Sequence, residues 1–439
     1  MRAETAPDRP SEVPNRAGFG ASGAKVDFRV RTRLTRGPSE RIRARGYHRT
    51  MAIYLDHAAT TPLRPEVLEA MLPVLTQHHG NPSSIHASGR RARQALDEAR
   101  EEIAGHLGAQ PREIVFTASG TEADNLALKG VAWAGSARGR HVVISAVEHK
   151  AITASAAILE RQGFRVTMVD VDEHGRVEPA ALEAAITEHT TIVSVQAANN
   201  EVGTLQPVEE IGAICRSRGI LFHVDAIQSA AHEPSSPDTW QASLVSLSAH
   251  KLGGPKGIGA LFVRRGTAML AQLTGGAQER QRRAGTENVA GAVGMAAAMR
   301  LAYADRASTT ATISTQRDRL VAGVLAIDGV QLTGHPSQRL PNSASFVIEG
   351  IEGGDLVAAL DLEGIEASTG SACTTGSVEP SHVLLAMGSD PQLAHGSLRL
   401  TLGHEVGTPE VDHTVKSIAA CVERLRGIPG VKPKAAVTA

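Results

Sequence analysis

The chain has 439 residues, and its 45 lysines and arginines against 46 aspartates and glutamates give a formal net charge of −1. Hydrophobic residues make up 42% and charged residues 21%, a globular composition that suggests about two or three domains. The balanced charge and the 3% of aromatic residues argue against a direct nucleic-acid partner, and no run of about 18 apolar residues predicts a membrane span. The three widely spaced cysteines are typical of reduced thiols, so we expect a cytoplasmic protein.

The first 50 residues differ in composition from the rest of the chain. They hold 12 basic residues against 5 acidic ones and are interrupted by proline and glycine. Such a stretch cannot bury enough surface to offset its ordering entropy, which predicts disorder. The acidic residues disfavour a transit peptide, and the missing apolar centre disfavours a secretory signal. We expect an ordinary tail or an upstream extension, with Met51 as the start of the working protein.

From Met51 onward, short β-type runs alternate with longer helical patterns, which is typical of an α/β fold. Several of the short runs are continuously apolar, as expected for a sheet covered on both faces, and right-handed crossovers should connect its parallel pairs. The expected strands are Glu113–Thr117, His141–Ser145, Arg165–Val169, Thr191–Gln196, Leu221–Val224, Leu244–Ser248 and Gly259–Val263. The expected helices between them are Arg90–Leu107, Thr121–Trp133, Ala151–Arg161 and Val208–Arg218.

The pattern changes after a long helix around residues 301–330. The elements expected beyond it are a strand at Ser343–Ile348, a helix at Asp355–Leu362, a loop at Ser368–Ser377, a strand at Ser397–Thr401 and a final helix. That last helix should begin with Thr408 as its N-cap, followed by Pro409 in the first turn. This succession predicts a second, smaller α+β domain.

A lysine stands where one predicted strand ends and a glycine-rich turn begins. The segment runs Ser246-Leu247-Ser248-Ala249-His250-Lys251 and continues into Gly253 and Gly254. In a desolvated site the pKa of a lysine falls, and its neutral amine can bond covalently to a carbonyl group. The neighbouring hydroxyl and imidazole groups could bind an anion such as phosphate. A surface lysine in a turn explains the six residues alone equally well.

Two further polar residues follow predicted strands at the same edge of the sheet. Asp225 ends the apolar run Phe222-His223-Val224, and His149 comes shortly after the strand at 141–145. Open α/β sheets bind ligands at the carboxyl ends of their strands. A carboxylate placed there could keep a pyridine nitrogen protonated, although Asp225 taken alone also fits a helix N-cap.

The run Thr117-Ala118-Ser119-Gly120-Thr121-Glu122 leads from a strand through a glycine turn into a helix. The amide groups of Gly120 and Thr121 at that helix N-terminus would suit a phosphate group. The alternative is a capped helix that binds nothing. The chain has no Walker A lysine pattern, and no paired cysteines that would predict a zinc site.

One cysteine lies in a loop of small polar residues. The sequence around it is Ser371-Ala372-Cys373-Thr374-Thr375-Gly376. Free cysteines are usually buried and inert, but this setting allows exposure and reactivity. Cys215 and Cys421 lie on apolar helical patterns, so we expect both to be inert core residues.

Together these segments resemble the cysteine desulfurases, a family of pyridoxal-phosphate enzymes of the class V aminotransferase group. The resemblance spans Met51 to about Arg426 and includes further motifs in the matching order. These are Tyr54-Leu55-Asp56-His57-Ala58-Ala59-Thr60-Thr61-Pro62, Gly80-Asn81-Pro82-Ser83-Ser84, Asn199-Asn200-Glu201-Val202-Gly203 and Arg283-Ala284-Gly285-Thr286-Glu287-Asn288. Each motif is weak alone, but their order is specific.

The resemblance implies the fold of type I pyridoxal-phosphate transferases. Such a fold has a large domain, with a mostly parallel mixed sheet between helices, and a smaller α+β C-terminal domain. Residues 1–50 would lie outside it as a disordered or upstream extension. The expected parts are then a segment at 51–65 that packs with the small domain, a large cofactor-binding domain at 66–306, and a small domain at 307–439 that carries the cysteine loop.

The resemblance also assigns roles around pyridoxal 5'-phosphate. Lys251 would hold the cofactor covalently and move the substrate's Cα proton, Asp225 would pair with the ring nitrogen, and His149 would stack on the ring. The remaining cofactor residues would be Gln228 and Asn200 near the ring hydroxyl, and Gly120, Thr121, Ser248 and His250 at the phosphate. Thr286 would reach the cofactor phosphate of a neighbouring subunit, which implies a homodimer.

The implied substrate is L-cysteine. Arg399 would hold its carboxylate with help from Asn200 and Asn342, and the Cys373 thiolate would take its sulfur as a persulfide and release L-alanine. The cysteine loop resembles the branch that supplies an iron–sulfur scaffold or a tRNA thiolase, so an acceptor of that kind is the expected partner. No resident metal is expected, although Cys373 could be a transient ligand of an iron–sulfur cluster. No membrane partner is expected.

Two alternatives remain open at this stage. One is a related enzyme of the same fold, such as a selenocysteine lyase, another pyridoxal-phosphate lyase or an aminotransferase. The other is a non-catalytic scaffold with this fold. The presence of Lys251, Asp225, His149 and Cys373 together argues against the scaffold, which would be expected to have lost at least one of them.

Overall fold

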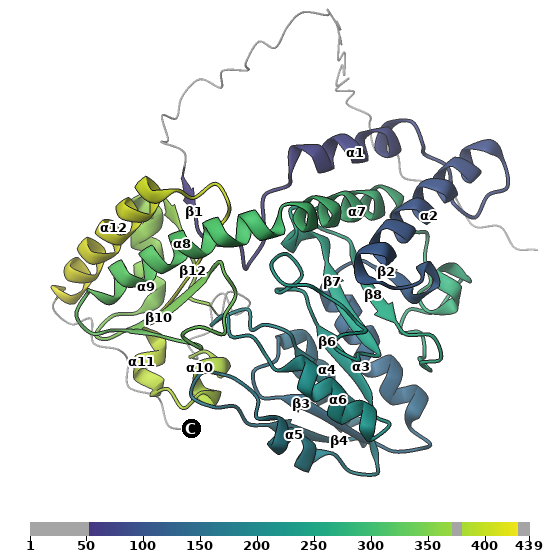
Figure 1. Cartoon of the computed structure of the whole chain (residues 1–439), viewed down its shortest axis with the longest axis horizontal. Coiled ribbons are helices and arrows are strands. Elements are labelled where there is room, and N and C mark those ends of the chain that lie inside the picture. Colours follow the sequence, from purple (N-terminus) through teal and green to yellow (C-terminus); the bar gives the residue numbers. More distant parts are fainter. Residues whose placement is uncertain (1–51, 371–379, 429–439) are drawn as a thin grey trace, which may run out of the picture. The chain divides into compact units, whose positions relative to one another are not determined.

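A seven-stranded sheet forms the centre of the larger part of the chain (Figure 1). The computed structural model describes residues 52–370 and 380–428. The strands follow the order β2-β8-β7-β6-β5-β3-β4 across the sheet. Their bounds are β2 (Ile114–Thr117), β3 (His141–Ser145), β4 (Arg165–Val169), β5 (Thr190–Gln196), β6 (Leu221–Asp225), β7 (Leu244–Ser248) and β8 (Gly259–Val263). Each predicted strand is present, with bounds that differ by at most one residue.

The sheet is mixed and mostly parallel, as predicted. β3 pairs in parallel with β4 and β5, and the parallel pairing continues through β6 to β7. Only β8 runs the other way among these seven strands, because it is antiparallel to both β7 and β2. The carboxyl ends of the other six strands therefore meet at one edge, where open sheets of this type bind their ligands.

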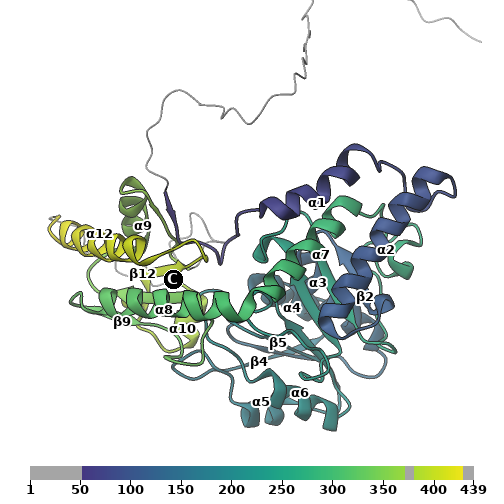
Figure 2. The same ribbon diagram turned by 45° about the horizontal axis from the view of Figure 1, so that its top comes forward.

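Helices cover both faces of this sheet, which explains the continuous apolar runs. Val142 and Ile144 of β3 pack into a cluster with α3 and α4, whereas Val143 packs into a second cluster with α1, α2, α6 and α7. Figures 1 and 2 both show α1, α2 and α7 side by side. The helix bounds are α1 (Pro65–Thr76), α2 (Ala87–Leu107), α3 (Gly120–Gly135), α4 (Lys150–Arg161), α5 (Pro179–Ala185), α6 (Val208–Ser217) and α7 (Val289–Ala304).

The C-terminal third forms a second sheet with its own core. Three antiparallel strands follow the order β12-β10-β9 and bury residues such as Phe346 and Leu400 against Leu320, Leu356 and Ile418 of the neighbouring helices. The elements are α8 (Arg306–Leu325), β9 (Val330–Leu332), β10 (Ser343–Ile348), α9 (Gly353–Leu362), α10 (His382–Ala386), α11 (Pro391–His395), β12 (Ser397–Thr401) and α12 (Thr408–Arg426). The exact domain bounds at residues 50, 65 and 306 stay a prediction.

One predicted helix start is wrong by a residue. Thr408 is the first residue of α12 rather than its N-cap, which is Gly407. The side chain of Glu410, the third residue of the helix, accepts a hydrogen bond from the Gly407 amide at 3.0 Å. This is the hydrogen bond that the N3 side chain makes in a capping box, and it stabilises the helix start in place of a threonine hydroxyl. None of the described helices is long and apolar enough to cross a membrane.

The segment before α1 connects the smaller sheet with the glycine-rich turn after β7. The short strand β1 (Ile53–Tyr54) pairs in parallel with β11 (Ile365–Glu366), and the backbone of Asp56 forms a bridge with Thr401. A few residues later, the Thr61 hydroxyl donates to the carbonyl of His250 at 2.8 Å. This segment is therefore held at both ends, and it passes directly over the predicted lysine site.

A strained loop lies near the start of α3. Glu279, Arg280 and Gln281 all have positive φ angles of 46°, 56° and 64°. Left-handed backbone costs non-glycine residues about 1–2 kcal/mol each, so the surrounding structure must hold this conformation. Glu279 does so through a buried two-point ion pair with Arg100, both N–O distances being 2.7 Å, and by accepting the Phe116 amide at 3.0 Å.

Candidate active site

The carboxyl ends of the parallel strands bring most of the predicted site residues to one edge. Asp225 and Ser248 are the last residues of β6 and β7, and Lys251 ends the short helical turn that follows β7. Gly120 and Thr121 begin α3, the helix that follows β2, and the loops after β3 and β5 carry His149 and Asn200. The predicted clustering follows from the strand order, because six strand ends share this edge.

Asp225 is buried and anchored by its own turn. One of its carboxylate oxygens accepts the Ile227 amide at 2.9 Å, so the residue does cap the turn that follows β6. Burial raises the pKa of Asp225, while the nearby Lys251 ammonium opposes that rise. Burial, and then the charge of Asp225, raise the pKa of Asp124 on α3. A fixed, buried carboxylate suits a protonated ring nitrogen.

Lys251 is half-buried beneath the segment that precedes α1. Its ammonium donates to the carbonyl oxygens of Ala58 and of Ala59, the latter at 2.9 Å. The side-chain amide of Gln228 donates to the Ala58 carbonyl as well, at 2.9 Å. Lys251 and Gln228 therefore meet at the carbonyl of Ala58. They are 193 and 170 positions away from Ala58 in the sequence, so no local pattern reveals these contacts.

His149 forms the N-cap of α4 and is held in one orientation. Its Nδ1 accepts the Ala151 amide at 3.1 Å, so the neutral ring carries its proton on Nε2. Burial, and then the positive charge of Lys251, lower the pKa of His149 to about 4. The imidazole is therefore uncharged at neutral pH, as a ring that stacks on a cofactor and exchanges protons requires.

We expect the His149 imidazole to stay neutral well below the ordinary histidine pKa of 6.5, because burial and Lys251 both disfavour its charged form. In an NMR titration of the ring C–H resonances, assigned with a His149→Gln variant, the shift should begin only below about pH 5. A midpoint near 6.5 for the resonance that this variant removes would contradict the described environment.

The start of α3 and the end of β7 form a cradle that fits a phosphate group. Ser119 caps the Glu122 amide at 3.1 Å, which leaves the first two helix amides, those of Gly120 and Thr121, without an intrahelical acceptor. The hydroxyl of Ser248 is buried and has no partner among the described residues. A Cβ at Gly120 would meet the Ile227 side chain at 2.2 Å and the Ser248 Cβ at 3.2 Å, so the start of α3 packs closely against the end of β7.

His250 lies in the turn after β7, next to the segment that precedes α1. Its Nδ1 lies 3.1 Å from the hydroxyl of Thr60, and burial together with Lys251 lowers its pKa to about 4. A neutral imidazole can donate one hydrogen bond to a phosphate oxygen without adding charge. The residues at this end of the site therefore fit pyridoxal phosphate, through the open amides, the unpartnered hydroxyl and the neutral ring.

Arg399 on β12 is almost completely buried, with 2% exposure. Its Nη1 donates to the carbonyls of Asn200 at 2.9 Å and Gly370 at 3.2 Å, and its Nη2 pairs with Asp56 at 2.7 Å. Its Nε has no partner among the described residues. A buried guanidinium with an open N–H group is poised for one more acceptor, which fits the predicted carboxylate clamp.

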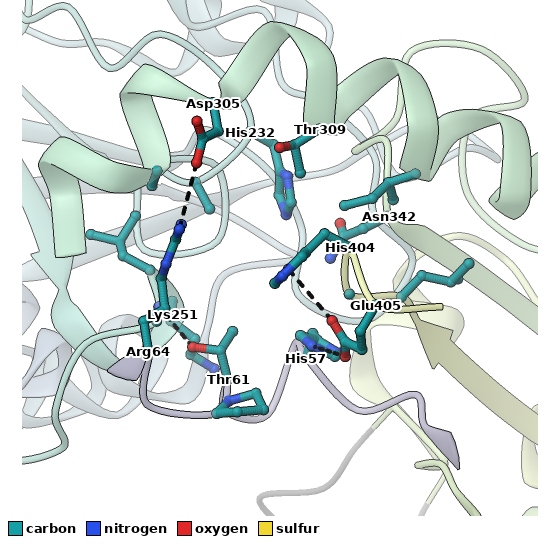
Figure 3. Close-up of a pocket in the computed structure, with 18 of the residues that line it drawn as sticks. His57, Thr61, Arg64, His232, Lys251, Asp305, Thr309, Asn342, His404 and Glu405 are labelled. Carbon is teal, nitrogen blue, oxygen red and sulfur yellow. Dashed lines mark hydrogen bonds and ion pairs between the residues drawn. The ribbon is translucent and has the colours of Figure 1, made fainter. Parts of the chain in front are cut away.

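A cavity of about 530 Å³ adjoins Lys251 (Figure 3). Polar contacts join residues of its lining: Arg64 forms an ion pair with Asp305 at 3.5 Å, and His57 Nε2 lies 3.0 Å from a Glu405 oxygen. Asn342 also lines this cavity, is 6% exposed, and its side-chain oxygen has no partner in the described part of the chain. Gln228 and Asn342 thus lie on the same cavity as Lys251.

Two predicted residues are not brought into this arrangement. Thr286 is exposed, and it hydrogen-bonds none of the other predicted site residues within the described ranges. Its loop is tied to α3 by the pair of Arg283 and Glu122 at 2.8 Å. Cys373 lies outside the described residues. Over residues 52–370 and 380–428, no group of three or more His, Cys, Asp or Glu side chains is arranged to hold a metal ion.

Sequence reasoning missed several residues that contact this site. Asp56, the partner of Arg399, lies inside the quoted N-terminal motif, but the motif does not say which residue it pairs with. Asp124 lies on the helical pattern that follows Gly120, and its spacing alone is that of an ordinary helix position. The other two cysteines match expectation: Cys215 and Cys421 are buried, and burial raises the pKa of the Cys215 thiol to about 12.

Comparison with known proteins places this site in a family. The family described as aminotransferase class-V matches residues 53–413. The cysteine desulfurase IscS of Methanosarcina thermophila is 47% identical over 383 residues, which cover 87% of this chain and 95% of that protein. The cysteine desulfurase IscS of Dictyoglomus turgidum is 46% identical over 377 residues, which cover 86% of this chain and 96% of that protein.

Solved structures agree with the sequence comparison. A structure described as a NifS-like protein has a TM-score of 0.81 and 37% identity, and the match covers 85% of this chain and 100% of that one. A structure described as SspA in complex with cysteine has a TM-score of 0.71 and 32% identity, with 80% of this chain and 99% of that chain covered.

Proposed function

Because the chain belongs to the aminotransferase class-V family, we propose that it is a pyridoxal-phosphate-dependent cysteine desulfurase. It converts L-cysteine to L-alanine and takes the sulfur onto Cys373 as a persulfide. The observation that carries this proposal is one arrangement of three side chains. A buried carboxylate, Asp225, and a lysine, Lys251, lie at the carboxyl edge of the large sheet. The buried guanidinium of Arg399 on β12, which has an open N–H group, reaches the Asn200 carbonyl in the loop after β5.

The residues present fit the cofactor. Lys251 would hold it covalently, Asp225 would pair with its ring nitrogen, and Gln228 and Asn200 would contact the region of its ring hydroxyl. The group at the phosphate comprises Gly120, Thr121, Ser248 and His250. When bound, pyridoxal phosphate supplies an electron sink that stabilises negative charge at the substrate's Cα.

The chain's own residues position the substrate and move its protons. Arg399 uses its open Nε to hold the L-cysteine carboxylate, with Asn200 and Asn342 beside it. The Lys251 amine is the group placed to take up the Cα proton as a general base. His149 carries its proton on Nε2 and can assist the transfer as a neutral donor.

Sulfur transfer is assigned to Cys373. Its thiolate attacks the substrate sulfur, so that an S–S bond forms while the C–S bond breaks, and the carbon keeps the electron pair and gains a proton to give L-alanine. The described chain leads up to Cys373 at the site itself, because the carbonyl of Gly370, three residues before it, accepts a hydrogen bond from Arg399 at 3.2 Å.

The proposal also covers the assembly of the subunits and the protein that accepts the sulfur. We expect a homodimer in which Thr286 of one subunit reaches the cofactor phosphate of the other, as the family resemblance implies, and the exposure of Thr286 is compatible with this role. The persulfide would pass to an acceptor protein, either an iron–sulfur scaffold or a tRNA thiolase. The expected site of the reaction is the cytoplasm.

Replacing Arg399 with lysine should raise the KM for L-cysteine by about 10- to 100-fold, because a charged hydrogen bond contributes roughly 1.5–3 kcal/mol and lysine keeps the charge without the planar fork. The kcat should change much less, since the clamp binds a part of the substrate that does not react. Steady-state alanine production measures both constants. A fall in kcat with an unchanged KM would remove Arg399 from carboxylate binding.

The experiment that tests the function combines a spectrum with a product assay. The purified protein, supplied with pyridoxal phosphate, should show an absorbance band at about 420 nm, which marks the covalently held cofactor. Addition of L-cysteine should then give alanine and sulfide in equal amounts once a thiol reductant is present. A band without alanine would contradict L-cysteine as the substrate, and no band at all would contradict the enzyme assignment.

A further inference from the structure

The turn that precedes α1 holds the amine of Lys251 by two backbone oxygens. The carbonyls of Ala58 and Ala59 both accept hydrogen bonds from this amine. A lysine ammonium has three N–H donors, and loss of one proton leaves two donors and a lone pair. When the two carbonyls take up the two donors, the lone pair points away from the turn. A base accepts a proton along its lone pair, so these carbonyls set the direction from which Lys251 can take one.

The turn keeps its place through contacts with the end of β12. The Ala59 amide donates to the Asp56 carbonyl at 3.0 Å, which closes the turn on itself. The Ala58 amide donates to the Thr401 hydroxyl at 2.8 Å, and this bond docks the turn on the smaller sheet. The carbonyls that face Lys251 are therefore fixed only while the turn stays docked on β12.

His57 makes the side-chain contacts that complete this docking. Its Nδ1 lies 3.1 Å from the Thr401 carbonyl oxygen, and its Nε2 lies 3.0 Å from Glu405 Oε1. Figure 3 shows His57 and Glu405 joined in the cavity that Lys251 also lines. Carbonyl and carboxylate oxygens only accept hydrogen bonds, so both ring nitrogens donate and the imidazole is a cation.

The surroundings of this pair support an ionised carboxylate. Burial alone would raise the pKa of Glu405, but the hydrogen bond and the charge of His57 outweigh it and lower that pKa below its usual value. A glycine makes room for the contact. A Cβ at Gly403 would lie 2.2 and 2.3 Å from the two Glu405 oxygens and 2.3 Å from His57 Nε2. The φ angle of Gly403 is not positive, so it is this close approach that calls for glycine.

We propose that His57 is a positioning residue for Lys251. It fixes the turn whose carbonyls hold the amine, and it thereby sets the direction from which the amine takes up the substrate's Cα proton. This inference rests on the proposed function, since His57 acts through the role assigned to Lys251. Thr401 and Glu405 belong to the smaller C-terminal part, so His57 ties that part to the lysine at the edge of the large sheet.

The test compares L-cysteine with its Cα-deuterated form on the cofactor-loaded, full-length protein, and counts alanine per molecule that shows the absorbance band. His57→Ala should lower kcat by about 10-fold or more, because a misplaced base slows proton transfer. The KM should stay within about threefold, since the Arg399 clamp keeps its guanidinium. The slowed variant should show a full primary isotope effect, which a loss of folded protein would not produce.

Two further variants separate positioning from a general structural effect. His57→Asn keeps an N–H donor close to the place of Nδ1, and should recover the rate to within about threefold of the unchanged protein. Gly403→Ala pushes the Glu405 carboxylate away from His57 and leaves both side chains in the chain. It should lower kcat by about threefold, because that carboxylate is partly exposed and water replaces it in part.

Non-additivity and a matched control complete the design. Beside His57→Ala, the Gly403→Ala change should add less than about 1.5-fold, because both act on one contact. His413→Ala removes an exposed histidine of α12 and should change neither kcat nor the isotope effect.

A slowed His57→Ala without a primary isotope effect would overturn the inference, as would a Gly403→Ala effect that persists in full beside His57→Ala. If His57→Ala yields no folded protein, the isotope effect of Gly403→Ala decides in the same way. Failure of the unchanged protein to form alanine from L-cysteine would instead overturn the proposed function beneath it.

Discussion

Replacement of Lys251 by alanine is expected to abolish L-cysteine turnover, with a fall in kcat of about 10⁴-fold, because one side chain both holds the cofactor and moves the Cα proton. The variant should also lose the absorbance band near about 420 nm that marks the covalently held cofactor. Both changes are measured on the same sample, by spectrum and by alanine release. The Lys251 amine donates to the backbone carbonyls of Ala58 and Ala59 in the segment before α1.

A matched control separates this effect from a general loss of positive charge. Lys416→Ala removes an exposed lysine from α12, far along the chain from the site, and should leave both the band and the turnover unchanged. Retention of substantial turnover in Lys251→Ala, with the cofactor still covalently attached, would show that another amine holds it.

The second large effect is expected at Cys373. Replacement of Cys373 by alanine should reduce L-cysteine desulfuration by at least about 10³-fold, because no other group in the proposed scheme attacks the substrate sulfur. The absorbance band should remain, since the cofactor residues are untouched. Cleavage of L-selenocysteine should persist, because that reaction depends less strictly on a thiol.

Cys215→Ala is the matched control for this prediction. Cys215 is buried in α6 and its thiol pKa is raised to about 12, so it is neither exposed nor a thiolate near neutral pH. Its removal should leave the rate per folded molecule unchanged. If Cys373→Ala kept full activity on L-cysteine, the alternatives of a lyase or an aminotransferase of the same fold would be favoured over a desulfurase.

The strands and the edge that carries the site could be predicted from local sequence. Val142, Val143 and Ile144 are apolar in succession because the two faces of β3 bury them in different clusters. Such runs reveal a covered sheet, and the polar residues that end them reveal its ligand edge. The positions of Asp225 and Ser248 at strand ends follow from this reasoning alone.

Contacts between distant segments could not be predicted in the same way. Arg399 pairs with Asp56 across 343 positions of sequence, and Lys251 donates to Ala58 across 193. No periodicity encodes such a partner, because it depends on how two sheets and a connecting segment pack. The reversal of β8 and the N-cap at Gly407 were missed for a related reason, since both depend on tertiary or capping contacts rather than on the apolar pattern.

The roles of individual residues depended on more than local pattern. Asp225 alone fits an N-cap, and it does cap its own turn through Ile227. Its functional assignment required the family resemblance and then its burial beside Asp124. The same holds for Arg399, whose strand position is ordinary and whose open Nε became evident only with its other partners in place.

The most direct test of the central claim is a single-turnover experiment read by mass spectrometry. One equivalent of L-cysteine is added to the cofactor-loaded protein without reductant, and the peptide that contains Cys373 is weighed while alanine is counted. The account predicts that this peptide gains about 32 Da, the mass of one sulfur atom, in proportion to the alanine formed. Alanine formation with no mass gain at Cys373, or a gain on Cys215 or Cys421 instead, would contradict it.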